Sequence, residues 1–182
     1  MEFDFDFDFH KSPEYQKAIE WYGPFIRENN FPDDKLAYWN QLHEYAKLRY
    51  EEVVEARKVI EEKADSLLKF VGTIAGALLA FFKVTGTLDA LGWRVYPALS
   101  CFALSAIFCL FARRTAPWPS PADIPKLARY NCNEVELIAV LSASLHCSVE
   151  GGKWVVNGKA RVVQIATSVA IMGLACLALL FV

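Results

Sequence analysis

The chain has 182 residues, a net charge of -2 at pH 7 and 54% hydrophobic residues. The length corresponds to about one ordinary domain, but the composition is too apolar for an ordinary soluble protein. The five cysteines are scattered and form neither a CxxC pair nor a His–Cys arrangement at ligand spacing. We interpret them as reduced, small apolar residues, and we expect neither a metal site nor a cofactor.

The N-terminal segment, residues 1–11, begins MEFDFDFDFH. Phenylalanine and aspartate alternate at strict period two, which places the rings on one side of an extended strand and Asp4, Asp6 and Asp8 on the other. The segment lacks the basic start and continuous apolar run of a secretory signal. A lone strand is not stable in water, so this acidic strand needs a partner.

Residues 12–65 predict a cytoplasmic helical region. Ser12 and Pro13 are typical of a helix start, and Gly23-Pro24 would break or kink that first helix. No proline or glycine lies between residue 34 and Gly72, so we expect one helix from about residue 34 through the first membrane span. Its apolar residues recur at heptad-like spacing. This seam could pack against the helices expected at residues 12–30 and 122–147, or associate with other copies, and the two can coexist. The seam consists of Trp39, Leu42, Ala46, Val53, Ala56, Ile60 and Leu67.

Three apolar runs predict membrane spans, at residues 66–84, 95–114 and 161–182. Each is long enough to cross a hydrocarbon core of about 30 Å. The short stretch TGTLDALGWR joins the first two runs. Residues 66–114 therefore predict a transmembrane hairpin, and residues 161–182 a third transmembrane helix.

Residues 115–160 predict a second cytoplasmic region. The stretch TAPWPSPADIP is typical of a stiff, extended spacer, and the pattern over residues 126–147 favours a helix. Asn157-Gly158 lies between Trp-Val-Val and a basic run, which is the strongest short hairpin signal in the chain. We therefore expect a small cytoplasmic β element, to which the N-terminal strand could be added.

Basic residues predict the orientation of the spans. They flank the spans on the side of the N-terminus and of segment 115–160, whereas the outer loop of the hairpin adds only Arg94 and Lys83. The expected fold is an all-α integral membrane protein with three transmembrane helices, a long cytoplasmic helix continuous with the first span, and the small β element. Its N-terminus would lie in the cytoplasm and its C-terminus on the outer side.

The spans contain few groups that could do chemistry. They have no paired carboxylates, no histidine and no Ser–His or Cys–His arrangement, so we do not expect an enzyme. A proton-coupled transporter would need an ionisable residue deep in a span, and Lys69 and Lys83 lie too close to the ends.

Small and hydroxyl residues are the remaining features of the spans. Gly72 and Gly76 form a GxxxG pair, which lets helices approach closely and favours an oligomer. The hydroxyl residues that could line a path through the membrane are Thr73, Ser100, Ser105, Thr167 and Ser168. Each hydroxyl could instead bond to a carbonyl of its own helix.

The stretch KLAYWNQLHEYAKLRYEEVVEARKVIEEKADS is a long cytoplasmic helix that leads directly into a transmembrane hairpin, and more cytoplasmic helical residues follow. Over about residues 34–147 this layout resembles the SLATT-type and related small transmembrane effectors of bacterial nucleotide-signalling antiphage systems, CBASS-like or Hailong-like. The resemblance is one of architecture rather than of motif. The third span and the acidic N-terminal strand depart from the simplest two-span pattern.

The resemblance implies a homo-oligomeric channel of the bacterial inner membrane, for which we guess a tetramer. A nucleotide or oligonucleotide made by a partner nucleotidyltransferase would control this channel. Opening would depolarise the membrane and halt the infected cell. Such an anionic ligand needs cations and preferably an aromatic face. The cytoplasmic side supplies Lys126, Arg129, Lys153, Trp154, Lys159 and Arg161, although positive-inside topology also explains these charges.

Several alternatives stay open. The acidic strand could link subunits, mimic an oligonucleotide at the basic site, or concentrate cations at the mouth of a pore through Asp4, Asp6 and Asp8. The protein could be a channel or pore-forming effector gated from the cytoplasm. It could instead be a membrane-anchored scaffold or regulatory subunit that docks a cytoplasmic partner, or a small transporter.

Overall fold

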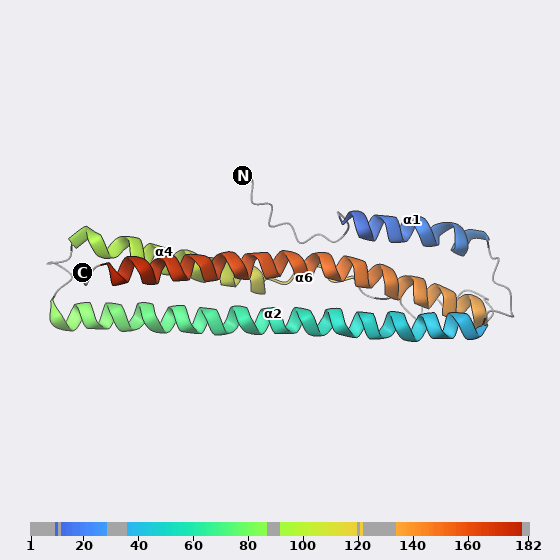
Figure 1. Cartoon of the computed structure of the whole chain (residues 1–182), viewed down its shortest axis with the longest axis horizontal. Coiled ribbons are helices and arrows are strands. Elements are labelled where there is room, and N and C mark those ends of the chain that lie inside the picture. The colour runs from blue at the N-terminus through green and yellow to red at the C-terminus, as the bar shows by residue number, and fades with distance from the viewer. Residues whose placement is uncertain are drawn as a thin grey trace. The chain divides into compact units, whose positions relative to one another are not determined.

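The computed structural model describes residues 10, 12–28, 36–86, 92–119, 121 and 134–179. These residues are mainly helical, and no strand occurs among them (Figure 1). The elements are α1 (Pro13–Glu28), α2 (Leu36–Thr85), the short 3₁₀ helix η3 (Gly92–Val95), α4 (Tyr96–Arg113) and α6 (Glu134–Ala178). Three of them, α2, α4 and α6, are long and apolar enough to cross a membrane. The expectation of an all-α protein with three candidate membrane helices is therefore confirmed.

Helix α1 begins as the sequence predicts. The Ser12 Oγ accepts a hydrogen bond from the backbone N–H of Tyr15 at 3.2 Å and donates one to the carboxylate of Glu14 at 3.1 Å. The bond from Tyr15 satisfies a backbone donor at the helix start. The helix continues to Glu28, so Gly23-Pro24 does not end it. Proline removes one backbone hydrogen bond, but its fixed φ is compatible with a helix.

Helix α2 runs from Leu36 to Thr85 without a break, as the absence of proline and glycine before Gly72 predicts. The residue after the helix is Gly86, whose φ of +64° lies in the left-handed region. Glycine takes this conformation without a steric penalty from a Cβ, and it is typical of the residue after a helix.

The predicted β-hairpin at Asn157-Gly158 is wrong, because residues 153–162 lie within the continuous helix α6. The buried residues of this stretch are Val155, Lys159 and Val162, and their spacing is that of one helix face. The turn preference of Asn-Gly is local, and burial of this face outweighs it. The N-terminal strand predicted for residues 1–11 lies outside the described residues, except for His10.

The chain divides into two compact units. Unit 1 consists of Met1–Arg57 and Ala116–Gly158, and unit 2 of Lys58–Thr115 and Lys159–Val182. Both α2 and α6 contribute residues to each unit.

The core of unit 1 contains residues of the predicted heptad-like seam. Trp39 is buried together with Val135 and Ala139 of α6, and Ala46 and Val53 are also buried. In unit 1 the seam therefore packs within the chain, which was one of the two alternatives. Association of the seam with other copies stays a prediction.

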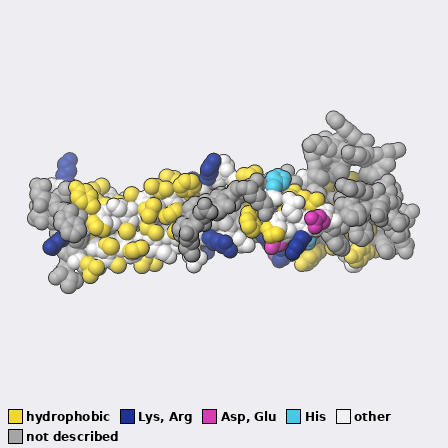
Figure 2. Space-filling model, turned by 90° about the horizontal axis from the view of Figure 1, so that it is seen from above, with side chains coloured by type: hydrophobic (Ala, Val, Ile, Leu, Met, Phe, Trp, Pro, Cys, Tyr) yellow, Lys and Arg dark blue, Asp and Glu magenta, His cyan; other side chains and the backbone are white. Residues whose placement is uncertain are grey.

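The core of unit 2 joins α2, α4 and α6, which lie side by side in Figure 1. It consists of Val71, Ala98, Phe102 and Ala170, with further apolar side chains packed around them. The surface of this unit is also apolar. Figure 2 shows hydrophobic side chains spread over it, with basic side chains at both edges of the apolar area. This surface suits contact with lipid.

Candidate functional site

The predicted ligand-binding residues are only partly within the described residues. Lys126 and Arg129 lie outside them, as do Asp4, Asp6 and Asp8 of the predicted pore and gating set. The remaining four ligand-binding candidates all lie on α6, with two in each unit: Lys153 and Trp154 in unit 1, and Lys159 and Arg161 in unit 2.

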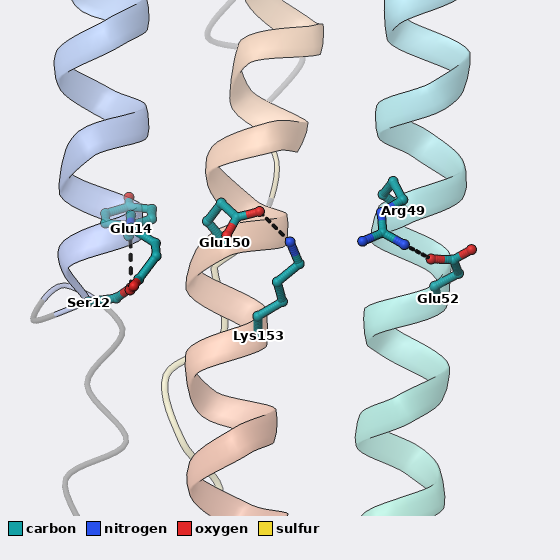
Figure 3. A network of polar contacts seen from close by, with 7 residues as sticks. Ser12, Glu14, Arg49, Glu52, Glu150 and Lys153 are labelled. Atoms are coloured by element: carbon teal, nitrogen blue, oxygen red, sulfur yellow. Dashed lines mark hydrogen bonds and ion pairs between the residues drawn. The ribbon is translucent and has the colours of Figure 1, made fainter.

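In unit 1, Lys153 is paired within its own helix. Its ammonium binds the carboxylate of Glu150, one turn earlier on α6, at 2.5 Å (Figure 3). The neighbouring Trp154 is 39% exposed. An exposed indole beside a half-exposed ammonium fits the chemistry that the sequence predicts for a nucleotide contact. The Glu150 carboxylate, however, partly neutralises the positive charge of Lys153.

In unit 2, Lys159 and Arg161 have different environments. Lys159 is fully buried, and its ammonium binds the carboxylate of Glu61 on α2 at 2.5 Å. Arg161 is exposed. The structure therefore directs Lys159 toward a contact between helices and leaves Arg161 at the surface.

The predicted pore-lining hydroxyls do not share one environment. Thr73 is exposed and donates a hydrogen bond to the Lys69 carbonyl of its own helix at 2.8 Å. Ser100 is also exposed. Ser105 is fully buried and donates to the Ala166 carbonyl of α6 at 2.8 Å. Ser105 therefore connects two candidate spans instead of facing the surface.

The predicted packing glycines lie on an open face of α2. A Cβ added at Gly72 or Gly76 would meet no atom within 4 Å. At Gly173 of α6, an added Cβ would lie 3.0 Å from both Cys101 and Phe102 of α4. Gly173 thus permits close packing within the chain, whereas Gly72 and Gly76 leave space beside α2.

Sequence reasoning missed a pair of acidic residues on α2 that contact both other spans. Besides the Glu61–Lys159 pair, Asp65 binds the Arg113 guanidinium of α4 at 2.9 Å. The available signal was the spacing of the two carboxylates, four residues apart just before the first apolar run. That spacing shows a shared helix face, but it does not identify the partners.

Sequence reasoning also missed the environment of Trp118, which follows Pro117 in the predicted spacer. In unit 1 its indole N–H donates to the Tyr50 hydroxyl at 3.1 Å, and the Arg57 guanidinium lies 4.8 Å from the ring centroid. A Cβ added at Gly152 would lie 3.2 Å from the same ring. The tryptophan between two prolines was the signal, because a large ring gains from burial and a buried indole N–H usually finds a hydrogen-bond partner.

Three residues of unit 1, Tyr15, His146 and Cys147, have pKa values shifted by burial. Burial raises the pKa of the Cys147 thiol to about 11, and burial together with Cys147 raises the pKa of Tyr15. Burial lowers the pKa of His146, against a smaller opposing effect of Glu150. The Cys147 thiol is therefore protonated at neutral pH, unlike a reactive cysteine. Among the described residues, no group of three or more His, Cys, Asp or Glu side chains could hold a metal ion.

Comparisons with protein-family models, with curated proteins and with solved structures found no match to this chain.

Proposed function

We propose that the protein is an oligomeric, ligand-controlled ion channel or pore-forming effector of the bacterial inner membrane. The proposal rests mainly on the continuity of α2 and α6. Each is one helix with residues in the more polar unit 1 and in the apolar unit 2. A shift or rotation of either helix in unit 1 is therefore passed along the same helix to a candidate span.

The open face of α2 supports the oligomeric part of the proposal. Gly72, Thr73 and Gly76 are exposed, and a Cβ added at either glycine would meet no atom within 4 Å in a single copy. A small-residue face in a membrane helix lets a second helix approach closely. The same face of other copies would suit this space, and a tetramer is our working copy number.

The ligand part of the proposal rests on the resemblance and on α6. A nucleotide or oligonucleotide from a partner nucleotidyltransferase would bind on the cytoplasmic side, where the predicted topology places the exposed Trp154 of unit 1. Opening would depolarise the membrane and arrest an infected cell. The predicted topology places the N-terminus in the cytoplasm and the C-terminus outside.

Single-channel recording in planar bilayers tests this proposal. The full chain is compared with a variant that lacks residues 2–9 and with Gly76→Leu, each alone and with candidate nucleotides and oligonucleotides. We expect discrete conductance steps that the deletion alters, and no steps from Gly76→Leu because a bulky side chain blocks the open face. Inserted protein that stays silent under all these conditions would contradict the channel.

A membrane-anchored scaffold or regulatory subunit is the second candidate, and two observations favour it. Thr73, Thr167 and Ser168 each donate to a carbonyl four residues earlier in the same helix, so these hydroxyls already have partners. In unit 1, Tyr38, Tyr45 and Leu48 are each more than half exposed, which suits docking of a partner. Silent bilayers combined with loss of partner binding in Tyr45→Glu would support this function.

A further inference from the structure

Two carboxylates of α2 each bind a cation from a different helix of unit 2. Glu61 binds the Lys159 ammonium of α6 at 2.5 Å, and Asp65 binds the Arg113 guanidinium of α4 at 2.9 Å. Because residues 61 and 65 are four positions apart, both carboxylates lie on one face of α2. About one turn of α2 therefore contacts both other candidate spans.

The two ion pairs differ in burial. The Lys159 side chain is 0% exposed and that of Glu61 is 33% exposed. Arg113 and Asp65 are 49% and 40% exposed. Exposed ion pairs contribute little, whereas removing one partner of a buried pair leaves an uncompensated charge. The Glu61–Lys159 pair is therefore the stronger of the two.

Within unit 2, the remaining contacts among these helices are mainly apolar and centre on Val71, Phe102 and Ala170. Between membrane helices, apolar contacts gain little from the exclusion of water, because lipid tails are equally apolar. Polar contacts between helices then have a larger share in fixing how the helices align. A buried polar or ionic group is best known for this role in setting the register of packed helices.

We infer that Glu61 and Asp65 form an ionic clasp, consisting of the pairs Glu61–Lys159 and Asp65–Arg113, that fixes the register of α2 against α6 and α4. Opening of the Glu61–Lys159 pair frees the unit 2 part of α6 to shift against α2. The clasp lies within unit 2 alone, so it does not depend on which proposed function holds.

Lysine labelling of the protein in lipid nanodiscs tests the clasp. A water-soluble amine-reactive ester is applied, and the labelled lysines are counted by peptide mass spectrometry. Lys159 is buried and ion-paired, so it should be protected, while the exposed Lys58 and Lys63 serve as internal references. We expect Glu61→Gln to raise the labelling rate of Lys159 about tenfold, because its ammonium loses its partner and becomes accessible.

The matched control is Glu62→Gln, which removes the exposed neighbouring carboxylate of α2. It should leave Lys159 protected. Asp65→Asn should raise labelling of Lys159 by less than about twofold, because it opens only the exposed pair. Equal labelling of Lys159 in Glu61→Gln and in the original chain would overturn the clasp, as would an equal rise in Glu62→Gln.

A double-mutant cycle tests the clasp through stability, and a Glu61→Gln chain that does not fold counts in it as the largest loss. Lys159→Met removes the buried charge and leaves a carboxylate that water can reach, so its unfolding midpoint should fall less than that of Glu61→Gln. Glu61→Gln with Lys159→Met should then be more stable than Glu61→Gln alone. Purely additive losses in this double-mutant cycle would show that the two side chains are not coupled, and the clasp would be rejected.

Discussion

Unit 1 and unit 2 pack their helices with different side chains. In unit 1 the contacts include large rings, with Trp39 in the buried cluster and Trp118 against Gly152. In unit 2 much of the contact comes from small residues, among them Ala98 and Ala170 around Phe102. Burial of a large ring is favourable for a unit in water, as the proposed topology has unit 1. For helices in lipid, as proposed for unit 2, that gain is small, so close approach and polar bonds matter more.

This difference predicts that ring truncation damages unit 1 most. Trp118→Ala removes the hydrogen bond to Tyr50, the contact with Arg57 and the ring beside Gly152. We expect the free energy of unfolding to fall by about 2–3 kcal/mol, measured by denaturant titration in detergent micelles. The control Trp154→Ala truncates an exposed ring of the same unit and should cost no more than about 0.5 kcal/mol. Equal losses from both variants would contradict the role of Trp118 as an anchor.

Unit 2 should be more sensitive to added volume. Gly173→Leu places side-chain atoms where a Cβ alone already lies 3.0 Å from Cys101 and Phe102, and overpacking of this kind costs about 1–3 kcal/mol. The Cys101 thiol of α4 lies close enough to the Cys176 thiol of α6 for the two to interact electrostatically, so the yield of an oxidative cross-link between them reports the packing. We expect a lower yield in Gly173→Leu.

The matched change on the open face is Gly76→Ala. It should keep the cross-link and raise the free energy of unfolding by about 0.5–1 kcal/mol, because alanine favours a helix more than glycine does. A loss of stability in an isolated copy would show that another part of the chain occupies the space beside Gly76.

A hydrogen bond between spans should matter more than one within a span. Ser105→Ala removes the buried bond to the Ala166 carbonyl, and such bonds in membranes average about 0.6 kcal/mol. Thr167→Val removes only a bond to its own helix and should cost less. The comparison is made by unfolding in mixed micelles, and a larger cost for Thr167→Val would reverse the assignment.

The smallest expected effect is a pH dependence of unit 1. Burial lowers the pKa of His146 from its ordinary value of 6.5, Lys153 lowers it further and Glu150 opposes them. Below pH 6.5 the unfolded chain binds the proton more readily than the folded chain, so stability should fall as the pH drops through 6.5 toward the lowered value. It should level off below that value. His146→Gln should flatten this part of the stability curve, and an unchanged slope would assign it to another group.

The features that the sequence predicts correctly depend on local properties. Long apolar runs identify the three candidate spans, Ser12 and Pro13 mark the start of α1, and the lack of breakers predicts an unbroken α2. Asn157-Gly158 fails as a hairpin signal because burial of a helix face outweighs a local turn preference.

The contacts of unit 2 could not be predicted in the same way, because they join residues far apart in the chain. Lys159 appeared to be one of several surface cations until its partner Glu61, 98 residues away, was known. Gly76 and Gly173 both lie in apolar runs, and the sequence does not distinguish their surroundings. The structure shows that Gly173 is crowded by α4 and that Gly76 is open.

The burial of Lys159 also has a consequence for biosynthesis. Glu61 is synthesised before Lys159, which lies 98 residues later in the chain. The Glu61 carboxylate is therefore already present when α6 emerges from the ribosome. A lysine without its partner is costly to remove from water. We therefore expect α6 to dock only after α2 has entered the membrane. In Glu61→Gln, α6 should stay undocked in newly made chains, and quality-control proteases should degrade these chains.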